Sequence, residues 1–153
     1  KRQLGAQAAV LMLNIRRMNI EADLLAADGI VSPLFLQLTG AEGNGAFGLA
    51  PGQPQEKMND WKKFKEKFSA AYGEQIEFFA PFAYDAAHMI AAAIRQANSL
   101  DPAHITAALH NMKYKGLTGT IAFDAEGNLV NPAYTIYQVR SGKWQPIQTF
   151  GSK

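Results

Sequence analysis

One short stretch, residues 24–33 with the sequence LLAADGIVSP, constrains the fold more than any other part of the chain. Its apolar run contains no turn residue before Asp28, and Gly, Ser and Pro follow the acid, so we expect a buried strand over residues 24–27 that ends at Asp28. In open α/β sheets, ligands bind beyond the carboxyl ends of the strands. Asp28 is therefore a candidate partner for a positively charged ligand group.

The alternative for Asp28 is a local structural role. Asp, Ser and Pro are frequent where helices begin, so Asp28 could cap the turn or helix that follows it. Its position in the sequence, taken alone, favours this capping role. The two roles can coexist, because a capping carboxylate still has a second oxygen.

Length and composition indicate one compact domain. The chain has 153 residues, of which 48% are hydrophobic and 18% charged, as in a globular protein with its own core. The 15 basic and 13 acidic residues leave a formal charge of +2, which is too small to indicate a nucleic-acid surface. The densest charge run, residues 62–67, mixes Lys with Phe and Glu and predicts the solvated face of an amphipathic helix.

The sequence contains no pattern for a cofactor or a metal. It has no Cys, and its three His residues, His88, His104 and His110, lack the spacing of metal ligands. The glycine-rich residues 40–48 lack the Lys-Ser/Thr of a phosphate-binding loop, so they predict a turn that leads into a strand. No apolar run approaches the length of a membrane span. We therefore expect no cofactor.

Helical and strand patterns alternate along the chain, and strands close it. The expected helices cover residues 7–18, 33–38, 55–72, 80–97 and 102–111. The expected strands cover residues 24–27, 46–49, 118–123 and 134–140, and Ser141-Gly142 joins the last of them to a return at 143–146. We interpret the aromatic stripe of the 55–72 helix as its core face. The pattern predicts an α/β fold with a mostly parallel sheet, flanking helices and a C-terminal β meander.

Several motifs, taken in order, resemble one protein family. They are Gly5-Ala6-Gln7-Ala8, Ala27-Asp28-Gly29-Ile30, Glu42-Gly43, Pro51-Gly52, Ala83-Tyr84-Asp85-Ala86 and the run from Leu117 to Asn128. From about Ala6 to Ile147, their order and spacing are similar to the C-terminal half of the periplasmic branched-chain amino acid binding proteins. These are the type I solute-binding components of ABC importers. The run from Leu117, followed by a strand at Tyr134, is fairly specific to this family.

The resemblance implies a domain organisation. Proteins of this family have two α/β lobes joined by hinge strands, and the ligand lies in the cleft between them. Residues 1–153 would form one lobe, resembling lobe II and incomplete at its N-terminus, and residues 117–150 would be closing strands that run toward the hinge and an absent first lobe. Because residues 1–4 depart from the glycine-rich turn of the family, we expect a fragment, or one piece of a divided protein, rather than a protein whose other lobe is a separate chain.

The resemblance also implies a ligand site. In the family an acid after this strand binds the ligand α-ammonium, and Asp28 matches it, although many members have Glu there. An aromatic residue at the start of the long helix contacts the ligand side chain. Phe82 matches that residue, Tyr84 is a weaker candidate beside it, and Ile30 is a further contact near Asp28. The residues that hold the ligand carboxylate belong to the absent lobe, so we expect the isolated chain to bind weakly or not at all.

The implied function is capture of an amino acid or similar small solute in the periplasm, by closure of two lobes, and its delivery to an ABC permease in the membrane. A ligand-sensing domain of a regulator or receptor on the same fold is the alternative. An enzyme is disfavoured because no nucleophile elbow, metal set or nucleotide motif is present. Asp85 and His88, one helical turn apart, are interpreted as a surface pair rather than an acid–base set.

Overall fold

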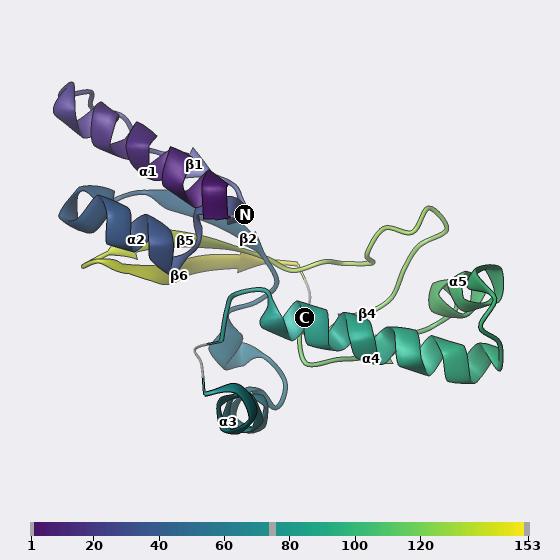
Figure 1. Ribbon diagram of the computed structural model, residues 1–153. Coiled ribbons are helices and arrows are strands. Elements are labelled where there is room, and N and C mark those ends of the chain that lie inside the picture. The colour runs from purple at the N-terminus through teal and green to yellow at the C-terminus, as the bar shows by residue number, and fades with distance from the viewer. Residues whose placement is uncertain (1, 74–75, 152–153) are drawn as a thin grey trace. The chain divides into compact units, whose positions relative to one another are not determined.

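The computed structural model describes residues 2–73 and 76–151, and the chain divides into two compact units (Figure 1). The first unit comprises the residues up to 53 together with residues 133–151, and the second comprises residues 54–132. The expectation that residues 1–153 form one lobe, with closing strands over residues 117–150, stays a prediction.

A four-stranded sheet organises the first unit. Its elements are α1 (Arg2–Arg17), β1 (Leu25–Ala26), the 3-10 helices η1 (Asp28–Ile30) and η2 (Gly40–Gly43), α2 (Pro33–Thr39), β2 (Phe47–Pro51), β5 (Tyr134–Arg140) and β6 (Lys143–Phe150). The strand order is β1-β2-β5-β6, and α1 and α2 lie along the sheet (Figure 1). The α/β class, the flanking helices and the closing hairpin are confirmed.

The sheet is not mostly parallel. Within the described residues, β1 and β2 pair in parallel, whereas β2 with β5 and β5 with β6 are antiparallel. The sequence predicts each of these strands within a few residues, but a strand pattern carries no information about the direction of its partner. The antiparallel partner of β2 is β5, far along the chain, so no short turn in the sequence indicates that these two strands pair.

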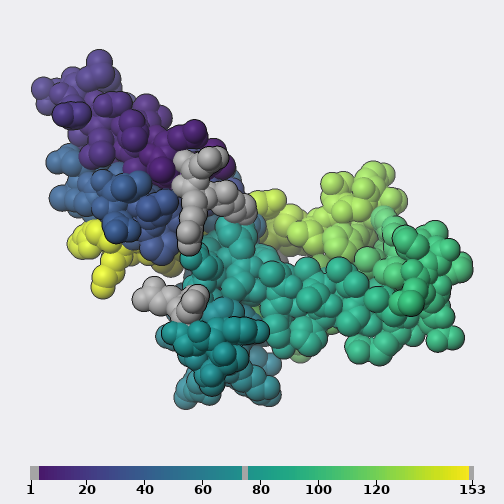
Figure 2. Space-filling model, in the orientation of Figure 1, coloured from purple at the N-terminus to yellow at the C-terminus, as the bar shows by residue number. Residues whose placement is uncertain are grey.

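The core of the first unit lies between α1, α2 and the sheet. Phe35 is fully buried, and its ring centroid lies 5.5 Å from that of Trp144. Trp144 Nε1 donates a hydrogen bond to the carbonyl of Ser32 at 3.2 Å, so the indole joins β6 to the start of α2. On α1, one face contributes Met12 to the core, while Val10 on the opposite face is 58% exposed. In Figure 2, α1 (purple) lies at the surface.

Three helices dominate the second unit. Its elements are η3 (Gln55–Lys57), α3 (Trp61–Tyr72), α4 (Ala80–Ala97), α5 (Pro102–His110), β3 (Tyr114–Lys115) and β4 (Thr120–Ile121). Asp101 caps α5 as the sequence predicts, because its Oδ1 accepts a hydrogen bond from Ala103 N at 2.7 Å. The strand predicted over residues 118–123 is short, and it pairs with β3, which the sequence pattern misses. No helix within the described residues is long and apolar enough to cross a membrane.

The helix predicted over residues 55–72 differs in two ways. It is interrupted where Asp60 adopts φ 49°, a left-handed conformation, so the chain forms η3 and then α3. Its aromatic stripe is not a core face, since none of the residues of α3, all of which the structure describes, is buried. A 3.6-residue period identifies an apolar face, but cannot tell whether anything covers it.

Removing the ring of Phe35 should destabilise the first unit. We expect Phe35→Ala to lower the free energy of unfolding by about 3–5 kcal/mol, because the side chain is fully buried and leaves a cavity. Leu38→Ala in the same helix is the matched control, since Leu38 is 45% exposed and should cost much less. Denaturant unfolding followed by tryptophan fluorescence measures both. Equal losses for the two variants would contradict this assignment of the core.

Candidate functional site

Asp28 lies immediately after a strand, as the sequence predicts. Strand β1 ends at Ala26, and Asp28 is the first residue of η1, where its carbonyl accepts a hydrogen bond from Val31 N at 3.2 Å. The residue is half-buried. It is not the cap of α2, because Ser32 occupies that position and its Oγ accepts from Phe35 N at 3.4 Å.

Close packing of α1 fixes the turn that carries Asp28. A Cβ built on Gly29 would lie 3.2 Å from the Cβ of Leu4, so the absence of a side chain lets α1 approach η1. Ile30, the last residue of η1, is 3% exposed and belongs to the core cluster with Phe35. Its side chain therefore anchors the turn, and the ligand contact expected of Ile30 stays a prediction.

Phe82 and Tyr84 lie in the first turns of α4, in the second unit. Phe82 is half-buried, with its ring centroid 6.1 Å from those of Phe78 and Phe79. Tyr84 is 45% exposed, and its ring lies edge-on to Phe64 at 5.1 Å between centroids. Both residues present aromatic surface, but the ligand contacts expected of them stay predictions.

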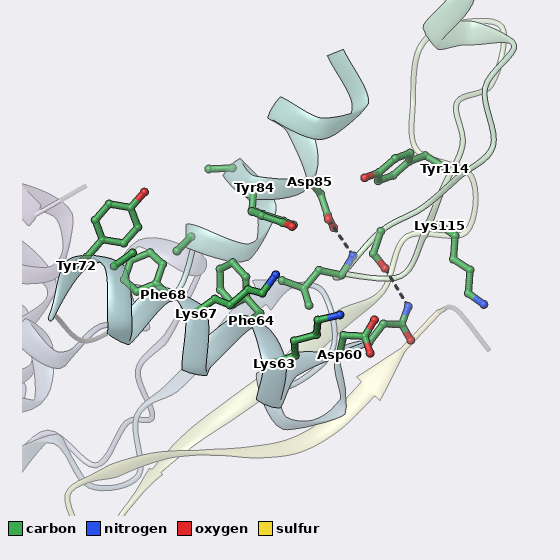
Figure 3. A pocket seen from close by; sticks show the side chains of 16 residues that line it. Asp60, Lys63, Phe64, Lys67, Phe68, Tyr72, Tyr84, Asp85, Tyr114 and Lys115 are labelled. Atoms are coloured by element: carbon green, nitrogen blue, oxygen red, sulfur yellow. Dashed lines mark hydrogen bonds between the residues drawn. The ribbon is translucent and has the colours of Figure 1, made fainter. Parts of the chain in front are cut away.

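The second unit contains a groove of about 1160 Å³ between α3, α4 and residues 114–117 (Figure 3). We call it the α3–α4 groove. Its aromatic lining comes from Phe64, Phe68 and Tyr72 on α3, from Tyr84 on α4 and from Tyr114 on β3. The remaining lining residues are Asn59, Asp60, Lys63, Lys67, Ala71, Ala80, Ala83, Asp85, Lys115, Gly116 and Leu117. Of the four expected site residues, only Tyr84 is among the described residues that line it.

A buried carboxylate holds one end of the groove. Asp85, labelled in Figure 3, is 1% exposed. It accepts three hydrogen bonds, from Leu117 N at 2.8 Å, Thr118 N at 2.8 Å and Thr118 Oγ1 at 2.7 Å. The interpretation of Asp85 and His88 as a surface pair is therefore wrong for Asp85. A buried carboxylate needs such partners, because an unpaired charge away from water is costly. Asp85 thus ties α4 to the segment after β3.

The same segment is held from a second side. Asn59 Nδ2 donates to the carbonyl of Gly116 at 2.9 Å, and Asn59 N donates to the carbonyl of Leu117 at 3.0 Å. Gly116 has no room for a side chain, since a Cβ there would lie 2.5 Å from Asp85 Oδ2. These contacts give the groove a fixed end wall.

Tyr114 adds a neutral hydroxyl to this wall. Its partial burial, and then the nearby negative charge of Asp85, raise the pKa of the Tyr114 phenol above its ordinary value of 10.0. At neutral pH the hydroxyl is therefore protonated and can donate a hydrogen bond. The described residues contain no group of three or more His, Asp and Glu side chains that could hold a metal ion.

The sequence contains a signal for Asp85 that the pattern analysis missed. The buried residues of α4 recur every fourth position, at Pro81, Asp85, Met89 and Ala93. An acid on the buried stripe of an otherwise apolar helix must find hydrogen-bond donors. Asp85 could therefore have been predicted as a buried acceptor, although its partners 32 and 33 residues later could not.

Replacing Asp85 by Asn should loosen the end wall. The amide has one acceptor oxygen in place of two, so at least one of the three donors loses its partner. We expect a loss of about 1–3 kcal/mol in stability and faster hydrogen exchange at the Leu117 and Thr118 amides. Asp60→Asn is the matched control, since Asp60 also lines the groove but is exposed. Unchanged exchange at both amides in Asp85→Asn would refute the role given to this carboxylate.

The sequence matches a family model over most of its length. Residues 3–143 match the model described as periplasmic binding protein. Leu/Ile/Val-binding protein homolog 1 of Brucella suis is 24% identical over 143 residues, which make up 91% of this chain and 37% of the relative. A leucine-, isoleucine-, valine-, threonine- and alanine-binding protein of Pseudomonas aeruginosa is 23% identical over 132 residues, 86% of this chain and 35% of that protein. The chain thus spans little more than a third of the length of these relatives.

Solved structures share the fold. A leucine binding protein from Thermotoga maritima aligns with a TM-score of 0.82 at 21% identity, over 95% of this chain and 42% of that chain. The branched-chain amino acid transporter substrate binding protein from Streptococcus pneumoniae, solved in complex with isoleucine, aligns with a TM-score of 0.78 at 22% identity, over 97% of this chain and 42% of that chain. The likeness shows a fold shared with part of these larger proteins.

Proposed function

Because the chain belongs to the periplasmic binding protein family, we propose that it supplies part of a binding site for a small amino acid or a similar solute. The family is one of solute-binding proteins, and its name implies a location in the periplasm or outside the cell. For this protein we infer the periplasm, delivery of the solute to an ABC permease, and no catalytic step. The names of relatives that bind leucine, isoleucine and valine support this choice of solute class.

The observation that carries the proposal is the position of Asp28. A half-buried carboxylate directly after β1 can accept charge-assisted hydrogen bonds from the α-ammonium of an amino acid. Such a partner is needed, because an ammonium removed from water without a counter-charge costs several kcal/mol or more by desolvation estimates. Asp28 is thus proposed to select for solutes that carry an ammonium group.

Aromatic surface supports an apolar preference for the rest of the solute. Phe82 and Tyr84 are each proposed to contact the ligand side chain, as the family resemblance implies. Burial of apolar ligand surface contributes about 25 cal/mol per Å², without dependence on direction. The charged contact would therefore set the class of ligand, and the aromatic contacts would add affinity for aliphatic side chains.

The first test removes the carboxylate of Asp28. A chimera in which this chain replaces the matching 37% of the Brucella suis relative would be titrated with L-leucine by calorimetry. We expect Asp28→Ala to weaken binding at least about tenfold, or about 1.4 kcal/mol, because the ammonium loses its counter-charge. Asp23→Ala is the matched control, since Asp23 is an exposed acid in the same unit. Equal affinity in Asp28→Ala and the unaltered chimera would remove Asp28 from the site.

The second test compares the chimera with the chain alone. Ligand sites are concave and bury most of the ligand, and the chain spans only 37% of this relative. We therefore expect the isolated chain to bind L-leucine at least about tenfold more weakly than the chimera, as followed by NMR titration. Equal affinities would show that the chain carries the complete site, and would contradict the proposal that it supplies only a part.

A further inference from the structure

Asn44 is the only Asn of the sequence that Gly follows. In such a pair the backbone nitrogen of Gly can attack the side-chain amide of Asn, because Gly has no Cβ to hinder the approach. The attack forms a bond from the Gly45 nitrogen to Cγ of Asn44. The Cγ–Nδ2 bond breaks, and Nδ2 leaves as ammonia with the proton of the Gly45 nitrogen. Water then opens the succinimide ring at either carbonyl and gives aspartate or isoaspartate.

The fold opposes this reaction at the attacking nitrogen. Gly45 N donates a hydrogen bond to the carbonyl of Val139 at 2.9 Å, and Val139 N donates to the carbonyl of Ala46 at 2.9 Å. These bonds extend the β2–β5 pairing beyond Phe47, with two residues opposite one, as in a β-bulge. A backbone N–H that donates to a carbonyl retains its proton, so Gly45 N cannot attack until its bond to Val139 opens.

The peptide between Asn44 and Gly45 is also turned away from the geometry of attack. Asn44 has ψ 139°, which holds the next nitrogen out of the plane of the succinimide ring, so the peptide must rotate about the Cα–C bond. Two contacts oppose this rotation. Asn44 Oδ1 accepts a hydrogen bond from Gly142 N at 3.1 Å, and the Asn44 carbonyl accepts one from Nη2 of Arg16 at 3.2 Å. The β5–β6 turn and α1 thus hold Asn44 within the first unit.

We propose that Asn44 is a site of spontaneous deamidation, and that the fold slows the reaction until residues 44–45 detach from β5. The attacking and the attacked atoms belong to adjacent residues, and water is the only reagent. The proposal therefore depends neither on exposure of a surface nor on the proposed solute site. Local opening of a strand end requires less free energy than unfolding of the whole chain.

The isoaspartate product should weaken the sheet. It adds a carbon to the backbone just before β2, and β2 is paired on both sides, with β1 and with β5. The added carbon displaces Gly45 relative to Val139, so we expect faster hydrogen exchange at the Val139 amide in the purified isoaspartate form. Unchanged exchange at this amide would contradict the effect on the sheet.

The test follows deamidation of the unaltered chain by peptide-mapping mass spectrometry, in native buffer and in urea at the same mildly alkaline pH. We expect Asn44 to be the first Asn to react in urea, and to react at least about tenfold more slowly in the folded chain. Hydrogen exchange of the Gly45 amide is measured in the same buffer, because exchange also requires the bond to Val139 to open. The slowing of deamidation should be at least as large as the protection of this amide.

Two core substitutions separate opening of the first unit from opening elsewhere. Val139→Ala should speed deamidation of Asn44 at least about fivefold, because Val139 is 1% exposed and its loss of packing loosens β5. Met89→Ala is the matched control, since Met89 is 5% exposed on α4 in the second unit, and it should leave the rate nearly unchanged. The comparison of deamidation with amide exchange uses the unaltered chain, so it decides the proposal even where a variant fails to fold.

Three results would overturn the proposal. The first is no deamidation at Asn44 in urea, since the residue would then not be a modification site. The second is a slowing in the folded chain that is smaller than the protection of the Gly45 amide, since the reaction would then proceed without the opening. The third is equal acceleration by Val139→Ala and Met89→Ala, since the reaction would then follow unfolding of the whole chain.

Discussion

The antiparallel pairing of β2 with β5 is the constraint on which the rest of the structure depends. It joins residues 47–51 to residues 134–138, and it is closed by a hydrogen bond from Gly52 N to the carbonyl of Ala133 at 2.7 Å and by one from Thr135 Oγ1 to the carbonyl of Gly52 at 2.8 Å. The whole second unit is therefore an insertion between two paired strands. Closing a loop of roughly 80 residues costs about 4 kcal/mol beyond a constant, so this pairing must be stable for the first unit to form.

The carboxylates of Asp85 and Asp28 differ in their burial. Asp85 is 1% exposed and its two oxygens accept three hydrogen bonds from within its own unit, which makes it an internal tie. Asp28 is half-buried and begins η1 after β1, where we propose that it meets the ammonium of the ligand. Sequence reasoning selects Asp28 because it follows an apolar strand. The spacing of Asp85 to His88 predicts a surface pair, whereas the buried stripe of α4 includes Asp85.

The sequence predicts those strands and helix ends that are determined by residues close together in the chain. Residues 134–140 alternate and form β5, Pro102 and Asp101 start α5, and Gly73 follows the end of α3. The direction of the β2 partner, the division into two units and the Asp85 contacts depend on residues far apart in the chain, so no local pattern contains them. The aromatic stripe of α3 shows the same limit, because hydrophobic periodicity identifies an apolar face but does not show whether another element packs against it.

The proposed solute site depends above all on recognition of the α-ammonium of an amino acid by Asp28. The most direct measurement is a double-mutant cycle on the chimera, in which L-leucine and isocaproate, its analogue without the amino group, are titrated against Asp28 and Asp28→Asn. We expect the chimera with unaltered Asp28 to prefer leucine and the Asp28→Asn variant to lose most of this preference, with a coupling of about 1.5 kcal/mol or more. The same preference for leucine in both proteins would contradict it.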